Sequence, residues 1–306
     1  MLTYKKKLIL ALLEKMGGNE ITAKSFQKLL FLYTRKSGNR IYDFVPYRYG
    51  CFSFEANKDV YALAKSGYLE IQESNHSESV YKLLHDNIDS IQSLSIFDVM
   101  ELDKIVNYFG NFDTDDLIAY TYRMYPYTAI NSIIKQNLLT QLELEKVENE
   151  RQRYIKDNAV LSTIGYEGLS LEKYLNLLIT NDVKVLVDVR KNAFSMKYGF
   201  SKVTLRKAVE GIGLKYLHVP QLGIESEDRQ ALNSQDDYDR LFNMYENTTL
   251  KENWEYVLQV RKVMDAYRRI CLTCFERNPR QCHRTRVANA LMSLSDVYYK
   301  YEPIVL

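Results

Sequence analysis

The segment CFERNPRQCHR holds two thiols, a carboxylate, an imidazole and three guanidinium groups within a short stretch. It joins an apolar, strand-like stretch to a helix-like one, and we expect Cys282, His283 and Arg284 in the first turn of that helix. Backbone N–H groups are free in a first helical turn, and the helix dipole makes this end electropositive. Arginine adds permanent charge and paired donors that suit phosphate or carboxylate. The segment therefore predicts an anion site. An alternative is that Arg284 only pairs with Asp188 or Glu276 and holds the sheet ends together.

Polar residues also follow two other apolar stretches of the chain. A carboxylate near arginines can orient a water molecule or stabilise a cationic transition state, and a histidine can carry a proton near neutral pH. We therefore expect catalytic roles for Asp188, Glu276 and His283. We expect ligand contacts from Tyr166, Glu167, Arg190, Cys274, Cys282 and Arg284.

The cysteines suggest a metal site by their spacing. Cys271, Cys274, Cys282 and His283 read C-x2-C-x7-C-H, which offers four ligands of the type that zinc prefers. On a strand, however, the side chains of Cys271 and Cys274 would point to opposite faces. Adjacent residues on a helix, such as Cys282 and His283, would also diverge. We therefore expect no metal and no cofactor.

Cys274 is a second candidate for thiol chemistry. Its spacing to Arg280 is that of phosphatase and sulfurtransferase loops, in which a strand-end cysteine attacks and the arginine completes an oxyanion cradle. Here Glu276 would repel a phosphate, and the loop has no glycine. Cys282 would have the lower pKa of the two thiols, because it stands at a helix start among arginines. A buried, inert thiol is the competing interpretation for each.

The elements that position these residues alternate between strands and helices. Strands are expected at 159–164, 183–189, 214–219 and 270–274, and helices at 171–180, 202–210, within 235–266, and at 282–292. Fully apolar strands that alternate with helices indicate a parallel sheet covered on both faces. The fold class predicted for this half is a three-layer, Rossmann-like α/β domain.

In such sheets, ligands bind beyond the carboxyl ends of the strands. That rule selects the loops 165–168, 188–200, 220–229 and 274–284, where the unusual polar residues gather. We expect one electropositive hollow there.

The N-terminal part is expected to be mainly α-helical. Apolar periodicity predicts helices at 5–16, 22–35 and 53–65, and two short strands follow at 68–71 and 80–83. Three helices followed by a β-hairpin is the winged-helix pattern, a common carrier of DNA recognition. The helix from 22 to 35 would face the nucleic acid, with contacts from Lys24, Lys28 and Arg35.

Composition is typical of a globular protein without a membrane span. The 306 residues are 46% hydrophobic and 26% charged, the formal net charge is +2, and the four cysteines favour a reducing cytoplasm. Residues 1–40 hold nine basic and two acidic residues, and residues 261–286 hold eight and two. The organisation predicted is a winged-helix-like module at 1–90, a helical extension and connector at 91–157, and an α/β domain at 158–306.

Four motifs carry a family resemblance: TIGYEGLSLEKYLNLL, VLVDVR, LKYLHVPQLG and CFERNPRQCHRTRVANAL. Over about residues 159–295 the chain resembles the bacterial and archaeal family catalogued as domain of unknown function 488. The resemblance implies a compact three-layer α/β fold and a site, but no reaction. It marks Gly165, Asp188, Arg190, Leu222, Gly223, Cys274, Glu276, Cys282, His283 and Arg284.

The N-terminal part more loosely resembles winged-helix modules of bacterial regulators and of antitoxin or proteolysis-adaptor proteins. The motifs ITAKSFQKLLFLYTR and YRYGCFSFEANKDVYALAKSGYL carry this resemblance. In the adaptor-like relatives, the module meets protein rather than DNA.

The sequence favours a nucleic-acid-associated protein, with DNA preferred over RNA. Its C-terminal crevice would bind a nucleotide-like anion, and whether it also processes that ligand is undecided. The alternatives are a ligand-sensing regulator without catalysis and a cytoplasmic enzyme on a small phosphorylated metabolite. No membrane partner is expected, and a homodimer is compatible with the sequence.

Overall fold

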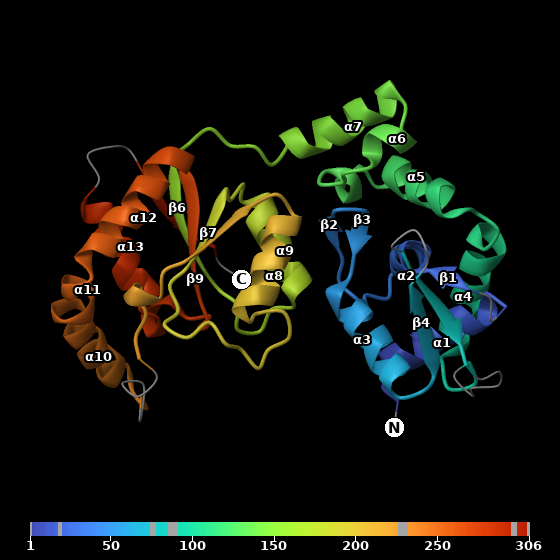
Figure 1. The fold of residues 1–306 in the computed structure, drawn as a ribbon, viewed down its shortest axis with the longest axis horizontal. Coiled ribbons are helices and arrows are strands. Elements are labelled where there is room, and N and C mark those ends of the chain that lie inside the picture. Colours follow the sequence, from blue (N-terminus) through green and yellow to red (C-terminus); the bar gives the residue numbers. More distant parts are fainter. Residues whose placement is uncertain are drawn as a thin grey trace. The chain divides into compact units, whose positions relative to one another are not determined.

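The protein divides into two compact units, Met1–Arg153 and Tyr154–Leu306 (Figure 1). The computed structural model describes residues 2–17, 20–73, 78–84, 91–225, 232–294 and 299–304. Each unit has its own hydrophobic core, and each is described by itself below.

The N-terminal unit begins with three helices and a small antiparallel sheet. Its first elements are α1 (Tyr4–Lys15), β1 (Ile21–Thr22), α2 (Ala23–Ser37), β2 (Val45–Tyr47), β3 (Gly50–Phe52), α3 (Phe54–Lys65), β4 (Leu69–Glu73) and β5 (Ser79–Leu83). Strands β4 and β5 form a hairpin and β1 pairs with β5, so the sheet order is β1-β5-β4. The three helices and the hairpin lie where the apolar periodicity predicts them. The β2–β3 hairpin was not predicted, because its strands are only three residues long.

Helix α2 is the central helix of this unit. The Thr22 side chain accepts a hydrogen bond from the Ser25 N–H at 3.1 Å and so starts the helix. Phe26, Leu30 and Tyr33 are fully buried along it. Because apolar residues occupy most of its circumference, α2 is enclosed by neighbouring elements rather than laid on a surface.

The helices after residue 90 complete the same core. They are α4 (Ile96–Phe109), α5 (Thr114–Met124), η1 (Pro126–Ala129), α6 (Lys135–Leu138) and α7 (Gln141–Gln152). Leu102 and Ile105 of α4 belong to the buried cluster formed by α1 and α2. Asp98 of α4 accepts hydrogen bonds from the hydroxyls of Tyr4 and Tyr33. Through these contacts, α4, which lies in the segment 91–157, packs against the first 90 residues. The sequence could not predict this packing, because periodicity shows that a helix has an apolar face but not which element covers that face.

The C-terminal unit is built on one parallel sheet. Its elements are β6 (Val160–Gly165), α8 (Leu171–Thr180), β7 (Val185–Asp188), α9 (Lys202–Gly211), β8 (Lys215–His218), η2 (Pro220–Leu222), α10 (Gln235–Asn247), α11 (Thr249–Glu252), α12 (Trp254–Tyr267), β9 (Arg269–Cys274), η4 (Pro279–Gln281), α13 (Arg284–Ser293) and β10 (Lys300–Pro303). The strand order is β10-β6-β9-β7-β8, and every neighbouring pair is parallel. The predicted α/β fold is confirmed.

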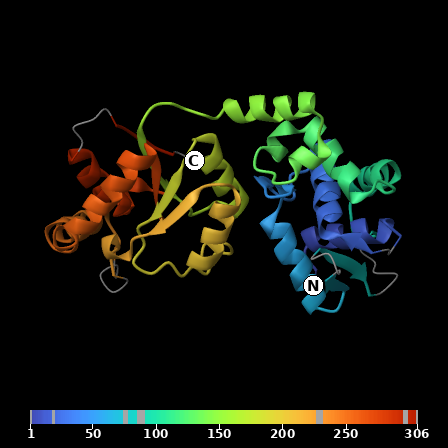
Figure 2. The ribbon, with the colours of Figure 1, turned by 45° about the horizontal axis from the view of Figure 1, so that its top comes forward.

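Helices cover both faces of this sheet (Figures 1 and 2). Helices α8 and α9 lie on one face, and α12 and α13 lie on the other. Every residue of β6, β7 and β9 is buried, which explains why apolar residues predominate in these strands. A sheet sandwiched in this way exposes little but its edges and strand ends, so a ligand meets it at the loops.

Strand β10 was not predicted from the sequence. It pairs with β6 at the edge of the sheet, and most of its residues are exposed. An edge strand with polar residues lacks the apolar run that marks a buried one. Throughout the described ranges, every helix is too short or too polar to cross a lipid bilayer.

Candidate functional site

The carboxyl ends of three strands place the candidate residues side by side. Gly165 of β6 pairs with Cys274 of β9, and Asp188 of β7 pairs with Thr273 on the other side of β9. Because all these strands run in the same direction, the loops that follow them leave from one edge of the sheet. The prediction that these loops gather at one edge is therefore confirmed for their described parts. Residues 226–229 of the predicted loop 220–229 lie outside the described residues.

Asp188 and Arg190 form a buried ion pair at this edge. The Arg190 Nε–H donates to Asp188 Oδ1 at 2.8 Å, and Nη2–H donates to Oδ2 at 2.5 Å. The Tyr216 hydroxyl donates to the same carboxylate at 2.7 Å. Burial alone would lower the pKa of Arg190, but the hydrogen bonds and charge of Asp188 outweigh it and hold the pKa above its ordinary value. Asp188 is fully buried, and its carboxylate oxygens are engaged by Arg190 and Tyr216, so it positions Arg190.

Arg190 also fixes the loops around it. Its Nη1 donates to the Tyr166 hydroxyl at 2.7 Å and to the Phe200 carbonyl at 2.9 Å. The Tyr166 and Phe200 rings stack with centroids 4.3 Å apart. The backbone carbonyl of Arg190 accepts from His218 Nε2 at 2.9 Å. One guanidinium therefore ties the loops after β6 and β7 into a rigid wall.

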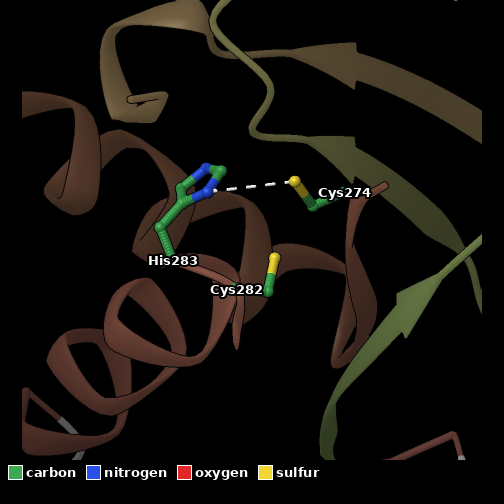
Figure 3. Close-up of side chains that lie close together, drawn as sticks. All are labelled: Cys274, Cys282 and His283. Atoms are coloured by element: carbon green, nitrogen blue, oxygen red, sulfur yellow. Dashed lines mark hydrogen bonds between the residues drawn. The ribbon is translucent and has the colours of Figure 1, made fainter. Parts of the chain in front are cut away.

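Two thiols and an imidazole meet behind this wall (Figure 3). The ligand atoms of Cys274, Cys282 and His283 all lie within 4.8 Å of one another, and all three residues are buried. The Cys274 Sγ lies 3.8 Å from His283 Nδ1 and donates to Glu276 Oε2 at 3.1 Å. Burial raises the pKa of the Cys282 thiol well above its ordinary value, and Cys274 raises it further. The sequence predicted the lower pKa of the two thiols for Cys282 because of the nearby arginines, whereas in the structure burial outweighs Arg284 and raises this pKa.

The helix after β9 starts later than predicted. Helix α13 begins at Arg284, with His283 as its N-cap, and Cys282 has an extended backbone with φ −136° and ψ 132°. Cys282 and His283 thus precede the helix, and their side chains turn toward the same space instead of diverging. The prediction that they diverge on a helix is wrong, because a 3-10 turn at Pro279–Gln281 delays the helix start.

Arg284 supports the loop that follows β9. Its Nη1 donates to the Glu276 carbonyl at 2.5 Å and its Nη2 donates to the Arg277 carbonyl at 3.2 Å. The side chain is 2% exposed, so it cannot reach out to an external phosphate. It does not pair with Asp188, whose carboxylate is held by Arg190. Arg284 is thus a structural clamp of the loop, although its partners are carbonyl oxygens and not the carboxylates that the sequence suggested.

Glu167 and Gly165 hold the same loop from the side of β6. Glu167 Oε2 accepts from the Arg277 N–H at 2.9 Å, and the Glu167 N–H donates to the Phe275 carbonyl at 2.9 Å. A Cβ atom at Gly165 would lie 1.9 Å from the Glu276 carbonyl oxygen. Only glycine therefore allows the two backbones to approach this closely.

A hollow of about 360 Å³ opens at this edge of the sheet. We call it the strand-end hollow, and its lining includes Arg190, Lys191, Lys197, Phe275, Cys274 and His283. Within the described part of the chain, no carboxylate side chain lines it. The charge of Arg190 is neutralised by Asp188, so Lys191 and Lys197 are the side chains that give this hollow its positive charge.

Arg284 and Glu167 line a different hollow. That second cavity has a volume of about 650 Å³ and is bordered by Gly165, Glu167, Arg277 and Arg284. The sequence placed Asp188, Arg190 and Arg284 around a single anion site, and the structure separates them. The physical reason is that the loop after β9 runs between the two cavities and accepts hydrogen bonds from Nη1 and Nη2 of Arg284.

The N-terminal candidates are distributed differently from the prediction. Lys28 is 2% exposed, and its ammonium donates to the carbonyls of Tyr49 at 2.6 Å and Cys51 at 3.3 Å. Burial lowers the pKa of Lys28. Lys24 pairs with Glu78 at 3.2 Å, and Arg35 is exposed at the end of α2. Because α2 is the buried central helix, it cannot lie in a nucleic-acid groove, and Lys28 has no surface to offer a phosphate.

Sequence reasoning missed Lys191 and Lys197 as lining residues and Tyr216 as a partner of Asp188. Both lysines lie in the loop 188–200, which the strand-end rule did select. Tyr216 stands on the neighbouring strand β8, two residues before the position that pairs with Asp188. If β7 and β8 had been predicted as neighbours in the sheet, Tyr216 could have been identified as a partner of Asp188.

Residues 170–291 match the model of the family described as Domain of unknown function DUF488. The match runs from the start of α8 to the end of α13, and so it includes the Asp188–Arg190 pair and the loop after β9. It confirms the resemblance that the sequence motifs indicated. No curated protein matches the chain.

Proposed function

We propose that the C-terminal unit binds an anionic, nucleotide-like ligand in the strand-end hollow of a nucleic-acid-associated protein. The observation that carries the proposal is the lining of this hollow, which combines three cationic side chains with aromatic rings. Its volume of about 360 Å³ falls in the usual range for small-molecule sites. The hollow also lies at the carboxyl ends of parallel strands, where ligands of such sheets bind.

Lys197 is the cation best placed to meet the anion. Its Nζ donates to the Tyr166 carbonyl at 2.8 Å, and an ammonium has three N–H donors. Burial lowers the pKa of Lys197, against the opposing influence of Glu167. An anionic ligand would place a negative charge beside this ammonium and would so offset the cost of its burial.

Lys191 can join Lys197 at little cost. It pairs with Glu225 at 2.6 Å, but both side chains are about half exposed. Such surface pairs contribute about 0–1 kcal/mol, so Lys191 can exchange this partner for a ligand phosphate.

The apolar part of the ligand would meet exposed rings. Phe194 is 68% exposed, Phe275 is 43% exposed, and both line the strand-end hollow. Large apolar side chains exposed around one hollow are typical of binding sites. Every nucleobase has a flat face that stacks on such rings, which favours a nucleotide over a bare phosphate.

Calorimetric titration with nucleoside monophosphates tests this proposal. Lys197→Ala should weaken binding about 10- to 100-fold, because a charge-assisted hydrogen bond contributes about 1.5–3 kcal/mol. Lys202→Ala, at an exposed position of α9, is the matched control and should bind as the wild type does. Equal affinity of the Lys197→Ala and wild-type proteins would contradict the proposal.

The same titration separates the alternative functions. A ligand-sensing regulator returns the nucleotide unchanged when the mixture is analysed by chromatography, whereas an enzyme returns a product. Binding of sugar phosphates but of no nucleotide would favour an enzyme on a small phosphorylated metabolite.

The N-terminal unit supports the association with nucleic acid. Apart from the β2–β3 hairpin between α2 and α3, its order of α1, β1, α2, α3 and the β4–β5 hairpin resembles that of winged-helix modules, in which the helix before the hairpin enters the groove. That helix is α3, with Lys58 and Lys65 exposed. Its carboxylates are already engaged, since Glu55 accepts from Lys5 and Asp59 accepts from Tyr42. We therefore assign the groove-facing role to α3 instead of α2.

Fluorescence anisotropy with duplex DNA at several salt concentrations tests this assignment. Binding should weaken steeply with salt, and Lys58→Ala combined with Lys65→Ala should reduce the log–log salt slope by about 2, since each phosphate contact contributes about 0.9. Lys251→Ala on α11 is the control and should leave the slope unchanged. Absence of DNA binding, or an unchanged slope in the double variant, would contradict the assignment and leave protein partners as the role of this unit.

A further inference from the structure

The three buried side chains behind the strand-end hollow have the composition of a metal centre. Cys274, Cys282 and His283 offer two sulfurs and one nitrogen, all within 4.8 Å of one another (Figure 3). Tetrahedral zinc bonds of about 2.3 Å to sulfur and about 2.0 Å to nitrogen place neighbouring ligand atoms roughly 3.5–3.8 Å apart. The Cys274 Sγ and His283 Nδ1 are already 3.8 Å apart. Only a small closure would bring all three atoms to the coordination distance.

The imidazole of His283 is oriented as a metal ligand. Its Nε2 lies 2.9 Å from the Val189 carbonyl, which can only accept a hydrogen bond, so Nε2 carries the proton. In the neutral imidazole, Nδ1 is then the nitrogen with the lone pair, and it lies 3.8 Å from the Cys274 sulfur. Metal-bound histidines almost always donate their other N–H to a carbonyl or carboxylate, which fixes the tautomer.

We propose that Cys274, Cys282 and His283 bind a divalent metal ion of the zinc class. Two thiolates and one imidazole are soft to borderline ligands, which select zinc over magnesium or calcium. Two thiolates also neutralise the charge of the ion, as a buried site requires. This proposal goes beyond ligand binding in the strand-end hollow and stands without it.

The surroundings of the cluster fit a thiolate-bound ion. The Arg284 Nε is buried, and no hydrogen-bond partner for it is found among the described residues. The charge of the Arg284 guanidinium is felt at the Cys282 sulfur, and a metal-bound thiolate there would be a suitable acceptor for the Nε–H.

The fourth coordination position would open to the strand-end hollow. Cys274 and His283 both line that hollow, so an ion between them is reached from it. Glu276 is not part of the group whose ligand atoms lie within 4.8 Å, although its carboxylate accepts from Cys274. Zinc sites with three protein ligands and one open position are those that bind a water molecule or a substrate.

Cobalt substitution tests the site without any nucleotide. The tag-free full chain is dialysed against a chelator, then titrated with Co²⁺, and absorbance is recorded. We expect one Co²⁺ per chain, a thiolate-to-cobalt charge-transfer band, the intense visible bands of tetrahedral Co²⁺, and loss of both on adding Zn²⁺. A wild-type protein that folds but binds no Co²⁺ stoichiometrically would overturn the proposal, and so would a Cys274–Cys282 disulfide in the unreduced protein.

Single variants identify the ligands. Cys274→Ser and Cys282→Ser should each remove one thiolate and lower the charge-transfer absorbance by about half or abolish it. Cys271→Ser is the matched control, because this thiol is equally buried on β9 but lies outside the cluster. Circular dichroism checks folding, and the wild-type spectrum decides the matter even if one variant unfolds. Full absorbance in Cys282→Ser, or its loss in Cys271→Ser, would overturn the ligand assignment. Because no nucleotide is present, a protein that binds no Co²⁺ would leave the proposed nucleotide binding untouched. A protein that binds no nucleotide would likewise leave the proposed metal site untouched.

Discussion

Asp188→Asn is expected to destabilise the C-terminal unit by about 3–5 kcal/mol, because it leaves a buried guanidinium without its countercharge. Arg190 is 5% exposed and Asp188 is fully buried, so water cannot replace the lost carboxylate. Arg190 also fixes the Tyr166 hydroxyl and the Phe200 carbonyl. The variant should therefore lose ligand binding in the strand-end hollow together with stability. Urea denaturation followed by circular dichroism measures the first effect, and calorimetric titration measures the second.

Two further variants serve as comparisons for the destabilisation expected in Asp188→Asn. Tyr216→Phe removes one hydrogen bond to the same carboxylate and should cost about 1 kcal/mol, or somewhat more because the acceptor is charged. Asp265→Asn weakens the ion pair of the half-exposed Asp265 with Arg261 and should cost about 1 kcal/mol or less. If Asp188→Asn cost no more than Asp265→Asn, Asp188 would not be the countercharge on which the fold of this edge depends.

Gly165→Ala is expected to cost about 3 kcal/mol or more and to abolish ligand binding. The added Cβ is fixed to the backbone of β6 and would lie 1.9 Å from the Glu276 carbonyl oxygen, which is itself a backbone atom. No side chain can rotate away, so either β6 or the loop after β9 must move. That loop carries Phe275 and leads to His283, which both line the strand-end hollow. Denaturation and titration on the same preparation report the two effects.

Gly213→Ala is the matched control for this variant. Gly213 has φ +84°, and nothing lies within 4 Å of the Cβ that alanine would add. It should cost only the strain of a positive φ, about 1–2 kcal/mol, and retain ligand binding. Equal losses at the two glycines would show that the close approach at Gly165 is not what shapes the site.

The fold of the C-terminal unit could be predicted because its strands are buried on both faces. Burial makes β7 a nearly continuous apolar run and β9 a mostly apolar one, which the sequence displays directly. Strand β10 escaped prediction because an exposed edge strand needs no such run. The hydrogen bond between Tyr33 and Asp98 could not be predicted either, because the two residues are far apart in the sequence and no local pattern records their contact.

The sequence predicted a site at the strand ends, and the structure shows that several of the side chains it selected there already have partners within the protein. Asp188 and Arg284 look like active groups in a sequence, whereas the structure uses their charges to hold loops. Such partners lie on separate elements, so only three-dimensional structure reveals that their hydrogen bonds are already made. The sequence also could not show that Cys282 and His283 lie close together. Helix α13 starts two residues later than predicted, and this later start brings the two side chains together.

Crystals grown with a brominated nucleoside monophosphate test the central claim most directly, because the anomalous signal of bromine locates the base. The account predicts a bromine peak beside Phe194 and Phe275, with phosphate density within hydrogen-bond reach of Lys197. A nucleotide bound instead in the cavity of Arg277 and Arg284, or outside both cavities, would contradict it.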